Sequence, residues 1–211
     1  TLLGAVTQHA AECISGITIH QLAKAGSPIV WGGAPAIFDM RRGTTPMGAV
    51  ETAMIDASYA QVGKSLGLPT HTYLGASDGK LVDAQAGMES GMTALIGALA
   101  GINMISGAGM LDFLACQSAE KLVLDAEGIA MAQRMVQGMK IHTETLATGF
   151  YEGVNFKGGD FLKQKATMKL FREEQHLPSS VIDRDSTRTW KAAGSLDAFD
   201  RCKIRVKELL A

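Results

Sequence analysis

Apolar residues recur at helical spacing in three successive stretches, and each stretch is followed by a short apolar run. Helices are predicted over residues 1–24, 48–66 and from about 83 to 100. Glycines that are typical of helix ends follow them, at Gly26, Gly67 and Gly101. The short apolar runs are residues 29–31, 70–74 and 103–106. The chain therefore repeats a helix, a glycine stop, a short strand and a loop of small residues.

The later part of the chain is more helical and more polar. A helix over residues 118–137 is predicted to begin at Ser118 as its N-cap. Its inward face is predicted to hold Leu122, Ala126, Ile129 and Ala130. A fourth strand is expected near residues 139–141, followed by a charged helix over 161–176. Two further helices are expected between residues 186 and 210, broken at Gly194 and Ser195.

Short apolar strands that alternate with long helices predict an α/β fold with parallel strands buried on both faces. A doubly wound sheet and a TIM (β/α)8 barrel share this pattern. The loops after the strands carry small and charged residues. This favours the barrel, because barrel enzymes hold their active sites in the loops at the C-terminal ends of the strands. A whole barrel has eight strands and takes about 250 residues. The three clear strands and the fourth expected near residues 139–141 therefore predict a partial barrel. We place it at residues 1–145, with a helical C-terminal extension packing on it at 146–211.

Composition narrows the functional classes. Hydrophobic residues make up 46% and charged residues 19%, and the net charge of −1 argues against nucleic acid or an anionic membrane as a partner. No apolar run approaches the roughly 20 residues of a membrane span, and no signal peptide is evident. Cys13, Cys116 and Cys202 are far apart, which predicts reduced thiols in a cytoplasmic protein without a metal site. The start inside a predicted helix indicates a piece of a larger protein.

The candidate catalytic residues lie between residues 69 and 89, after the second predicted strand. Glycine and alanine let the loop 75–80 bend, and the helix that follows begins with unpaired N–H groups that favour negative charge. The candidates are Ser77, Asp78, Asp83, Gln85 and Glu89. The alternative is that these residues only cap the helix or face solvent.

Candidate substrate-binding residues are more scattered. Arg41 and Arg42 have the chemistry to hold a carboxylate, and aromatic rings at Phe150 and Tyr151 suit a cation. The others adjoin predicted strands or loops: His71, Gly107, Met110, Asp112, His142, Glu144 and Lys163. A solvated arginine pair, hydrogen-bonded histidines and simple aromatic packing are the alternatives. The segment GAGMLD, residues 107–112, has the start of a dinucleotide-binding fingerprint, but Asp112 stands where that fingerprint needs a third glycine. It is therefore a weak signal for nucleotide binding.

Three segments together resemble the trimethylamine methyltransferase family, including its members without pyrrolysine. They are GSPIVWGGAPAIFDMRRGTTPMGAVE, SDGKLVDAQAGMESGMTALIGALAGINMISGAGMLD and KLVLDAEGIAMAQRMVQG. The resemblance extends from about Gly4 to Leu209. It implies a β/α barrel that moves a methyl group from a methylated amine to the Co(I) of a separate corrinoid protein. The enzyme would bind no cofactor directly, its partners would be the corrinoid protein and the small amine, and we expect a homo-oligomer.

Two departures from the family pattern favour a quaternary amine such as glycine betaine. Every position is an ordinary amino acid, whereas the relatives that act on trimethylamine carry pyrrolysine. Asp160, Lys163 and Lys165 stand where many relatives have the histidine-rich pattern GGHFL followed by H-T. A quaternary amine leaves as a neutral tertiary amine, and Lys163, Arg41 or Arg42 would bind the carboxylate of a betaine.

Two other classes of function stay open. One is a barrel enzyme of different chemistry, a phosphate-binding lyase or isomerase that uses GAG as a phosphate loop and Lys80 as a nucleophile. The other is a non-catalytic docking subunit for a corrinoid protein.

Overall fold

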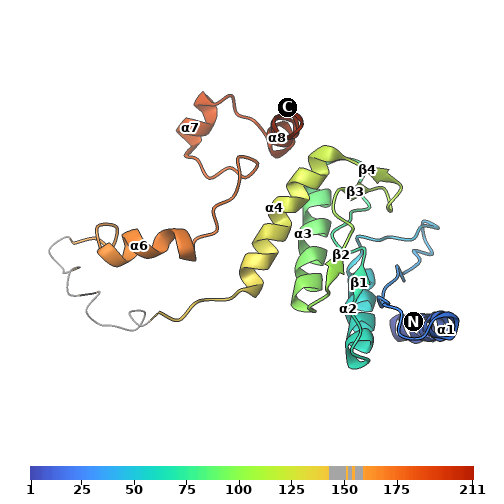
Figure 1. Cartoon of the computed structure of the whole chain (residues 1–211). Helices are drawn as coiled ribbons and strands as arrows, with labels where there is room; N and C mark the ends of the chain where they lie inside the picture. Colours follow the sequence, from blue (N-terminus) through green and yellow to red (C-terminus); the bar gives the residue numbers. More distant parts are fainter. Residues whose placement is uncertain (143–150, 152–153, 155–158) are drawn as a thin grey trace.

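The computed structural model describes residues 1–142, 151, 154 and 159–211, and its helices form a layer beside short strands (Figure 1). The helices are α1 (Leu2–Ala23), α2 (Val50–Ser65), α3 (Ala84–Leu99), α4 (Ala119–Val136), α6 (Lys165–Glu174), α7 (Thr187–Ala192) and α8 (Ala198–Leu210). The strands are β1 (His71–Thr72), β2 (Met104–Ile105), β3 (Met110–Leu111) and β4 (Cys116–Gln117).

The three predicted apolar runs lie side by side and run parallel. β1 pairs with β2 in the register His71 to Met104. Trp31 forms a parallel bridge to Thr70, and its N–H donates to the Pro69 carbonyl at 2.8 Å. The predicted parallel pairing is therefore confirmed, although the regular strands are only two residues long.

Side chains of β1 alternate between the helices and an open face, as the twofold period of a strand requires. Thr72 is fully buried and donates to Asp56 on α2. His71 points the other way and its Nε2 lies 2.7 Å from Ser106 Oγ. Met104, its register partner, is 52% exposed. In the part of the chain that the structure describes, the helices cover one face of these strands, and burial of both faces stays a prediction for the whole protein.

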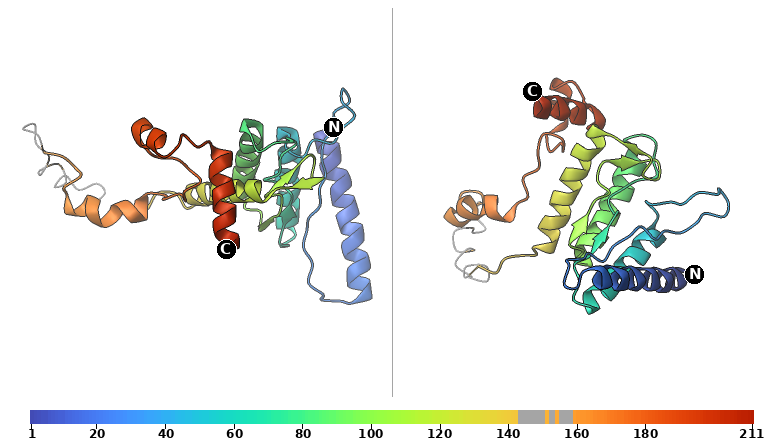
Figure 2. Two further views of the ribbon diagram at one scale, coloured as in Figure 1. Left: turned by 90° about the horizontal axis from the view of Figure 1, so that it is seen from above. Right: turned by 45° about the vertical axis from the view of Figure 1, so that its right-hand side comes forward.

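The first four helices pack in chain order, α1 on α2, α2 on α3 and α3 on α4, and the last helix, α8, packs on α4. As a result α1 and α8 lie at opposite ends of the layer (Figure 1, Figure 2). Small residues allow the close approach of helix and strand, since Ala53 and Ala60 are fully buried and a Cβ on Gly63 would lie 2.6 Å from the Trp31 ring. This arrangement fits a sector of a β/α barrel, which stays a prediction.

The buried face of α4 is polar near the start of the helix. Ser118 is the N-cap, as predicted, and its side chain accepts the Lys121 N–H at 3.2 Å. Leu122 and Ala126 were expected inside, but Leu122 is 44% exposed and Ala126 is also exposed. Lys121 and Asp125 are buried in their place, because they form an ion pair with each other.

Two further predictions differ from the structure. The loop expected after β2 contains the antiparallel hairpin of β3 and β4. The strand expected near residues 139–141 is absent from the described chain, where Met139 and Ile141 are each 91% exposed. The predicted break at Gly194 and Ser195 is confirmed between α7 and α8, with φ angles of 98° and 55°.

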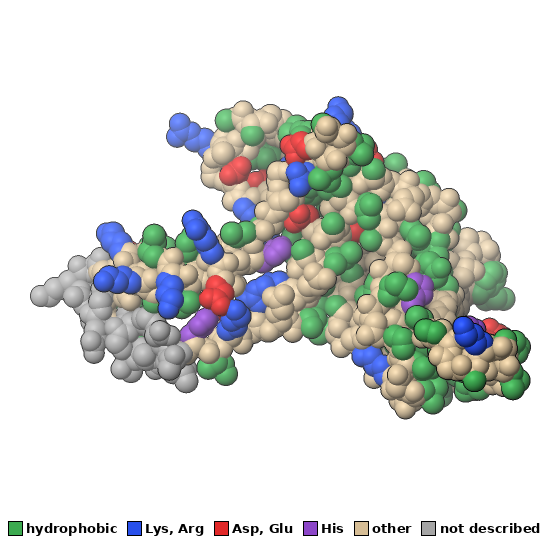
Figure 3. Space-filling model, in the orientation of Figure 1, with side chains coloured by type: hydrophobic (Ala, Val, Ile, Leu, Met, Phe, Trp, Pro, Cys, Tyr) green, Lys and Arg blue, Asp and Glu red, His purple; other side chains and the backbone are tan. Residues whose placement is uncertain are grey.

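The C-terminal helices differ in how they meet the rest of the molecule. α6 lies apart from the helical layer (Figure 1), and basic side chains gather over it (Figure 3). α8 packs on α4, with Cys202 fully buried. The predicted domain boundary at residue 145 lies outside the described residues. Among the helices that the structure describes, none is both long and apolar enough to cross a bilayer.

Candidate functional site

The loops that follow β1 and β2 are joined by backbone hydrogen bonds. Ser77 N–H donates to the Met110 carbonyl at 3.0 Å, and Asp112 N–H donates to the Gly79 carbonyl at 3.0 Å. A Cβ on Gly107 would lie 1.9 Å from the Tyr73 carbonyl oxygen. Only glycine allows this approach, so the predicted binding residue Gly107 has a packing role that is sufficient to explain it.

Glu89 on α3 reaches back to the loop 75–80. Its Oε2 accepts the Ser77 hydroxyl at 2.6 Å and the Asp78 N–H at 2.9 Å, and its Oε1 accepts Gln85 Nε2 at 2.9 Å. Ser77 is fully buried, and its Oγ also accepts the Gly79 N–H at 2.9 Å. Four of the five predicted catalytic residues therefore form one hydrogen-bonded group.

Asp78 connects this group to the start of α2. Its Oδ1 accepts the N–H groups of Met47 and Gly48 at 2.7 and 3.1 Å. The side chain is buried, which raises the pKa of Asp78, while the two backbone donors lower it and Glu89 nearby raises it. A Cβ on Gly48 would lie 2.6 Å from Glu89 Oε2. The absence of a side chain at Gly48 thus lets two carboxyl groups approach each other.

Asp83 stands outside this group. It is the N-cap of α3, and its side chain accepts the Ala86 N–H at 3.2 Å. For this residue the capping interpretation describes its contacts fully.

Lys80 lies at the junction of the two loops. Its Nζ donates to the Asp78 carbonyl at 2.7 Å, pairs with Asp112 at 3.1 Å and lies 3.9 Å from the centroid of the Phe113 ring. Asp112, Phe113 and Leu114 all have positive φ angles, of 50°, 55° and 71°. Sequence reasoning missed Phe113, and the only signal was an aromatic residue directly after Asp112.

The remaining predicted residues lie elsewhere. The Arg41 guanidinium forms two hydrogen bonds with Asp39 at 3.2 Å each, and Arg42 pairs with the same carboxylate at 3.6 Å. The hydrogen bonds from Arg41 hold the pKa of Asp39 at about 2. His71 lies on the open sheet face beside Ser106. The arginine pair and His71 are thus separate from the Glu89 group.

Three predicted residues lie near α6. His142 Nε2 is 2.5 Å from Glu174 Oε1, and Lys163 pairs with Asp160 at 3.4 Å. The Tyr151 ring meets the Phe161 ring edge-on at 5.9 Å. Glu144 and Phe150 lie outside the described residues.

A buried ion pair holds the loop that follows β2. Lys121 Nζ donates to Asp125 Oδ2 at 2.5 Å and to Ser90 Oγ at 2.7 Å. The same Asp125 oxygen accepts the Gly109 N–H at 2.7 Å. Burial raises the pKa of Asp125, and its hydrogen bonds oppose that shift. A cavity of about 120 Å³ beside this pair separates parts of α3 and α4.

Another buried carboxyl lies between the sheet and α2. Asp56 is 1% exposed, and its Oδ2 accepts the Thr72 hydroxyl. Its Oδ1 has no hydrogen-bond partner among the described residues. Burial raises the pKa of Asp56 to about 7, although the Thr72 bond lowers it. No sequence pattern had pointed to this residue.

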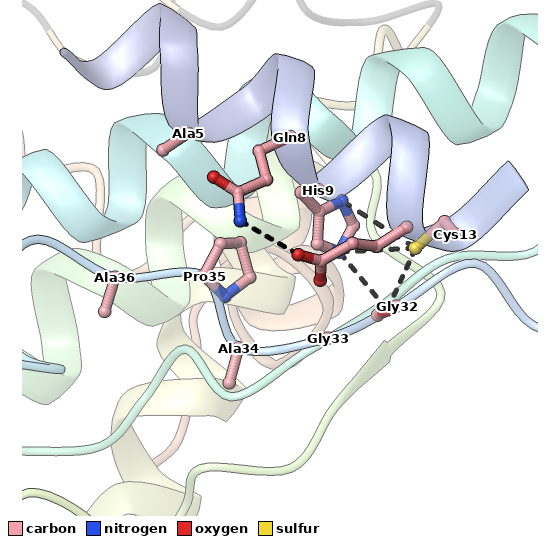
Figure 4. A pocket seen from close by; sticks show the side chains of 10 residues that line it. Ala5, Gln8, His9, Cys13, Gly32, Gly33, Ala34, Pro35 and Ala36 are labelled. Atoms are coloured by element: carbon pink, nitrogen blue, oxygen red, sulfur yellow. Dashed lines mark hydrogen bonds between the residues drawn. The ribbon is translucent and has the colours of Figure 1, made fainter. Parts of the chain in front are cut away.

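A cavity of about 510 Å³ lies between α1 and residues 32–36 (Figure 4). His9 Nε2 lies 3.3 Å from the Gly32 carbonyl oxygen, and Cys13 Sγ lies 3.5 Å from the same nitrogen. Burial lowers the pKa of His9 and raises the pKa of Cys13, so it favours the neutral form of each group. The described chain brings no three His, Cys, Asp or Glu side chains together in a way that suits a metal ion.

Comparison with known proteins identifies the chain's relatives. The family model for trimethylamine methyltransferase matches residues 1–211. The chain belongs to this family. It is 38% identical over 211 residues to trimethylamine methyltransferase MttB1 of Methanosarcina acetivorans, covering 99% of the chain and 42% of that relative.

A second relative has a different substrate in its name. The chain is 34% identical over 212 residues to the glycine betaine methyltransferase of Desulfitobacterium hafniense, covering 100% of the chain and 44% of that protein. The resemblance inferred from the sequence segments is thereby confirmed, and the relatives are methyltransferases, the enzyme class that we expected. The chain spans less than half the length of the curated relatives that it matches.

Proposed function

We propose that the protein containing this chain moves a methyl group from a methylated amine to the Co(I) of a corrinoid carried by a partner protein. The observation that carries the proposal is the family match, which extends through all 211 residues. We also propose that the chain is a sector of a TIM-type β/α barrel. The open sheet face at His71 and Met104 would then face the barrel interior, where the rest of the protein covers it.

In this methyl transfer the main task of the protein is to bind and orient the amine. Co(I) supplies the electron pair that forms the new bond to the methyl carbon, and the C–N bond breaks with its electrons going to nitrogen. A quaternary amine leaves as a neutral tertiary amine and needs no proton. Asp78, Glu89 and Asp112 gather at the strand ends, and their negative charge suits an ammonium group there.

We propose glycine betaine or a similar quaternary amine as the first-choice substrate. The identities of 34% and 38% to the two kinds of relative do not decide between the amines. The choice is supported by Asp160, Lys163 and Lys165, which replace the histidine-rich pattern of many relatives. It is also supported by the ordinary amino acid at every position of this sequence.

The test uses the full-length parent protein with a reduced corrinoid protein and a panel of glycine betaine, other betaines, carnitine and trimethylamine. We expect the corrinoid absorbance to change with one quaternary amine, and that amine to be demethylated in equal amount. Trimethylamine alone supporting the change would contradict the substrate choice. No change with any amine, when the corrinoid protein is active with a known methyltransferase, would contradict the proposed activity.

The carboxylate contacts of a betaine have their own test. Arg41 and Lys163 are each paired with an acidic neighbour, so a substrate carboxylate has to replace that partner. We expect Arg41→Ala or Lys163→Ala to raise the KM for glycine betaine severalfold. If both leave the KM unchanged, neither residue binds the carboxylate.

The phosphate-loop alternative has less support from the geometry. The Gly109 N–H is already bonded to Asp125, and Gly107 packs against the Tyr73 carbonyl. An unchanged rate in Lys80→Ala would remove the nucleophilic role that this alternative gives to Lys80. Binding of the corrinoid protein without methyl transfer from any amine would instead favour a docking subunit.

A further inference from the structure

We infer that the face of the Phe113 ring, together with the Asp112 carboxylate, is the subsite for the ammonium group of the substrate, and that the Lys80 ammonium occupies this subsite until substrate displaces it. The inference rests on the proposed function, because it names residues that would receive a methylated amine. The Lys80 ammonium would therefore compete with the substrate for the subsite.

The three groups around Lys80 Nζ are those that bind cations. The ring centroid of Phe113 lies 3.9 Å away, within the distance of about 6 Å at which a ring face attracts a cation. The Asp112 carboxylate lies at 3.1 Å, and the Asp78 carbonyl oxygen lies at 2.7 Å. Ring faces and negative charge are what proteins use to bind quaternary ammonium groups.

The backbone holds Phe113 in this place at a cost. Three consecutive residues, Asp112 to Leu114, have left-handed φ angles between 50° and 71°, and this conformation costs about 1 kcal/mol or more for each residue with a side chain. The turn is fixed by the Asp112 N–H, which donates to Gly79 at 3.0 Å, and by Ala115 N–H, which donates to Asp112 at 2.9 Å. Strain of this kind persists where the surrounding structure imposes it, and it is concentrated at functional sites.

Lys80 is free to leave the ring. Its side chain is 59% exposed and that of Asp112 is 43% exposed, so solvent reaches both. The lysine stem has four methylene groups and carries the ammonium into water at little cost. A trimethylammonium group is larger than an ammonium group and has no N–H to donate, so it cannot share the ring face with Lys80. Binding of such a group therefore requires that Lys80 move away.

The subsite is also connected to the predicted catalytic residues. Asp112 bonds to Gly79, Gly79 bonds to Ser77 Oγ, and Ser77 bonds to Glu89. A cation on the Phe113 ring would thus lie at the strand ends, close to the candidate catalytic residues Ser77 and Glu89.

The chain contains a matched control. On α8, Lys203 Nζ lies 4.8 Å from the centroid of the Phe199 ring and 2.6 Å from Asp200. These residues repeat the lysine, ring and carboxylate of the subsite, but they lie on one helix and have ordinary helical backbone. Substitutions there report on the loss of a surface cation–π contact and ion pair outside the subsite.

The experiment measures binding of tetramethylammonium to the full-length parent protein by titration calorimetry. Lys80→Met removes the competing charge, and we expect it to tighten binding by about 3- to 10-fold. Phe113→Leu removes the ring face, and we expect it to weaken binding at least about threefold. Lys203→Met and Phe199→Leu are expected to leave the Kd unchanged. Circular dichroism of each variant checks that the fold is retained, and Lys80→Met carries the test alone if Phe113→Leu does not fold.

The outcomes separate this inference from the proposed function. An unchanged or weaker Kd in Lys80→Met, or no binding to either protein, overturns the subsite. Methyl transfer from glycine betaine together with an unchanged Kd overturns the subsite and leaves the proposed function standing. Tighter tetramethylammonium binding in Lys80→Met without methyl transfer from any amine supports the cation subsite and overturns the proposed function.

Discussion

The Ser77 hydroxyl donates a 2.6 Å hydrogen bond to Glu89, which lies on α3. The same carboxylate oxygen accepts the Asp78 N–H, and Asp78 in turn accepts two N–H groups that precede α2. Two helices and the loop after β1 are therefore fixed to one another by two carboxyl groups. The same residues are the first candidates for chemistry, so their structural role has to be measured before a loss of activity is interpreted.

Glu89→Ala is expected to destabilise the protein. The substitution leaves the buried Ser77 hydroxyl and the Asp78 N–H without an acceptor, which costs about 1–3 kcal/mol. Glu89→Gln keeps an acceptor oxygen and is expected to cost less than half as much. Urea unfolding of the two variants measures the difference. Glu12→Ala is the control, since Glu12 bonds Gln8 on an exposed helix face; equal effects at positions 12 and 89 would contradict the prediction.

Gly107→Ala is expected to be among the most disruptive single substitutions in the chain. The added Cβ would lie 1.9 Å from the Tyr73 carbonyl oxygen, so the strand ends would have to separate, at a cost of about 3 kcal/mol or more. Gly128→Ala is the matched control. Nothing lies within 4 Å of a Cβ there, and alanine in a helix is expected to stabilise by about 0.5–1 kcal/mol. Thermal unfolding that ranks the two variants the other way would refute both expectations.

Asp56 is expected to make the protein less stable as pH rises. Burial raises the pKa of folded Asp56 from 3.8 to about 7, so between those pH values the folded state holds a proton that the unfolded state has lost. The unfolded state then binds fewer protons, and the free energy of unfolding falls with pH, by on the order of 3 kcal/mol from pH 4 to 7. Denaturant unfolding at several pH values measures the slope.

The comparison variant for Asp56 is Asp56→Asn, which cannot ionise and is expected to lack this slope. Asp39→Asn serves as a second control with the opposite sign. The folded pKa of Asp39 is lowered to about 2, so its contribution is present above pH 4 and is lost as the pH falls toward 2. A wild-type slope between pH 4 and 7 that survives in Asp56→Asn would show that another group causes it.

Lys121→Met is expected to cost about 3–5 kcal/mol, because it leaves the Asp125 carboxylate buried without its cation. The double variant Lys121→Met with Asp125→Leu removes the charge left behind and is expected to recover part of that loss, while the Gly109 N–H stays unpaired. Chemical denaturation compares the variants. Lys203→Met, which breaks an exposed pair with Asp200, is expected to cost less than about 1 kcal/mol. A double variant no more stable than Lys121→Met would argue against the charge as the cause.

Local patterns in the sequence predicted most of the helices and strands. Helical spacing, glycine stops and the Ser118 cap are signals carried by neighbouring residues, and the helices and parallel strands lie where these signals placed them. The hairpin of β3 and β4 was missed because each strand has two residues, too few for an alternating pattern. The inward face of α4 was wrong because spacing does not show that Lys121 and Asp125 satisfy each other when buried.

The candidate site was predictable only in part, because some of its contacts join residues that are far apart in the sequence. Ser77, Asp78 and Glu89 lie close enough in sequence for a strand-to-helix loop to bring them together. The contact between Asp78 and Gly48 spans 30 residues, and no local pattern contains it. Phe113 reaches Lys80 only because three residues adopt a left-handed turn, a conformation that the sequence LDFL does not suggest.

The polar face of α4 also determines how this helix is rotated about its own axis. The neighbouring surface of α3 is made of small residues, among them Gly87, Gly91 and Ala94, and such a surface offers few side chains that would resist rotation or sliding. Lys121 has to reach Ser90 on α3 while Asp125 accepts the Gly109 N–H. A turn of α4 by one residue, about 100°, would move both side chains out of reach of these partners. We therefore expect the double variant Lys121→Met with Asp125→Leu to have an α4 that samples several rotational settings, even though part of the lost stability is recovered.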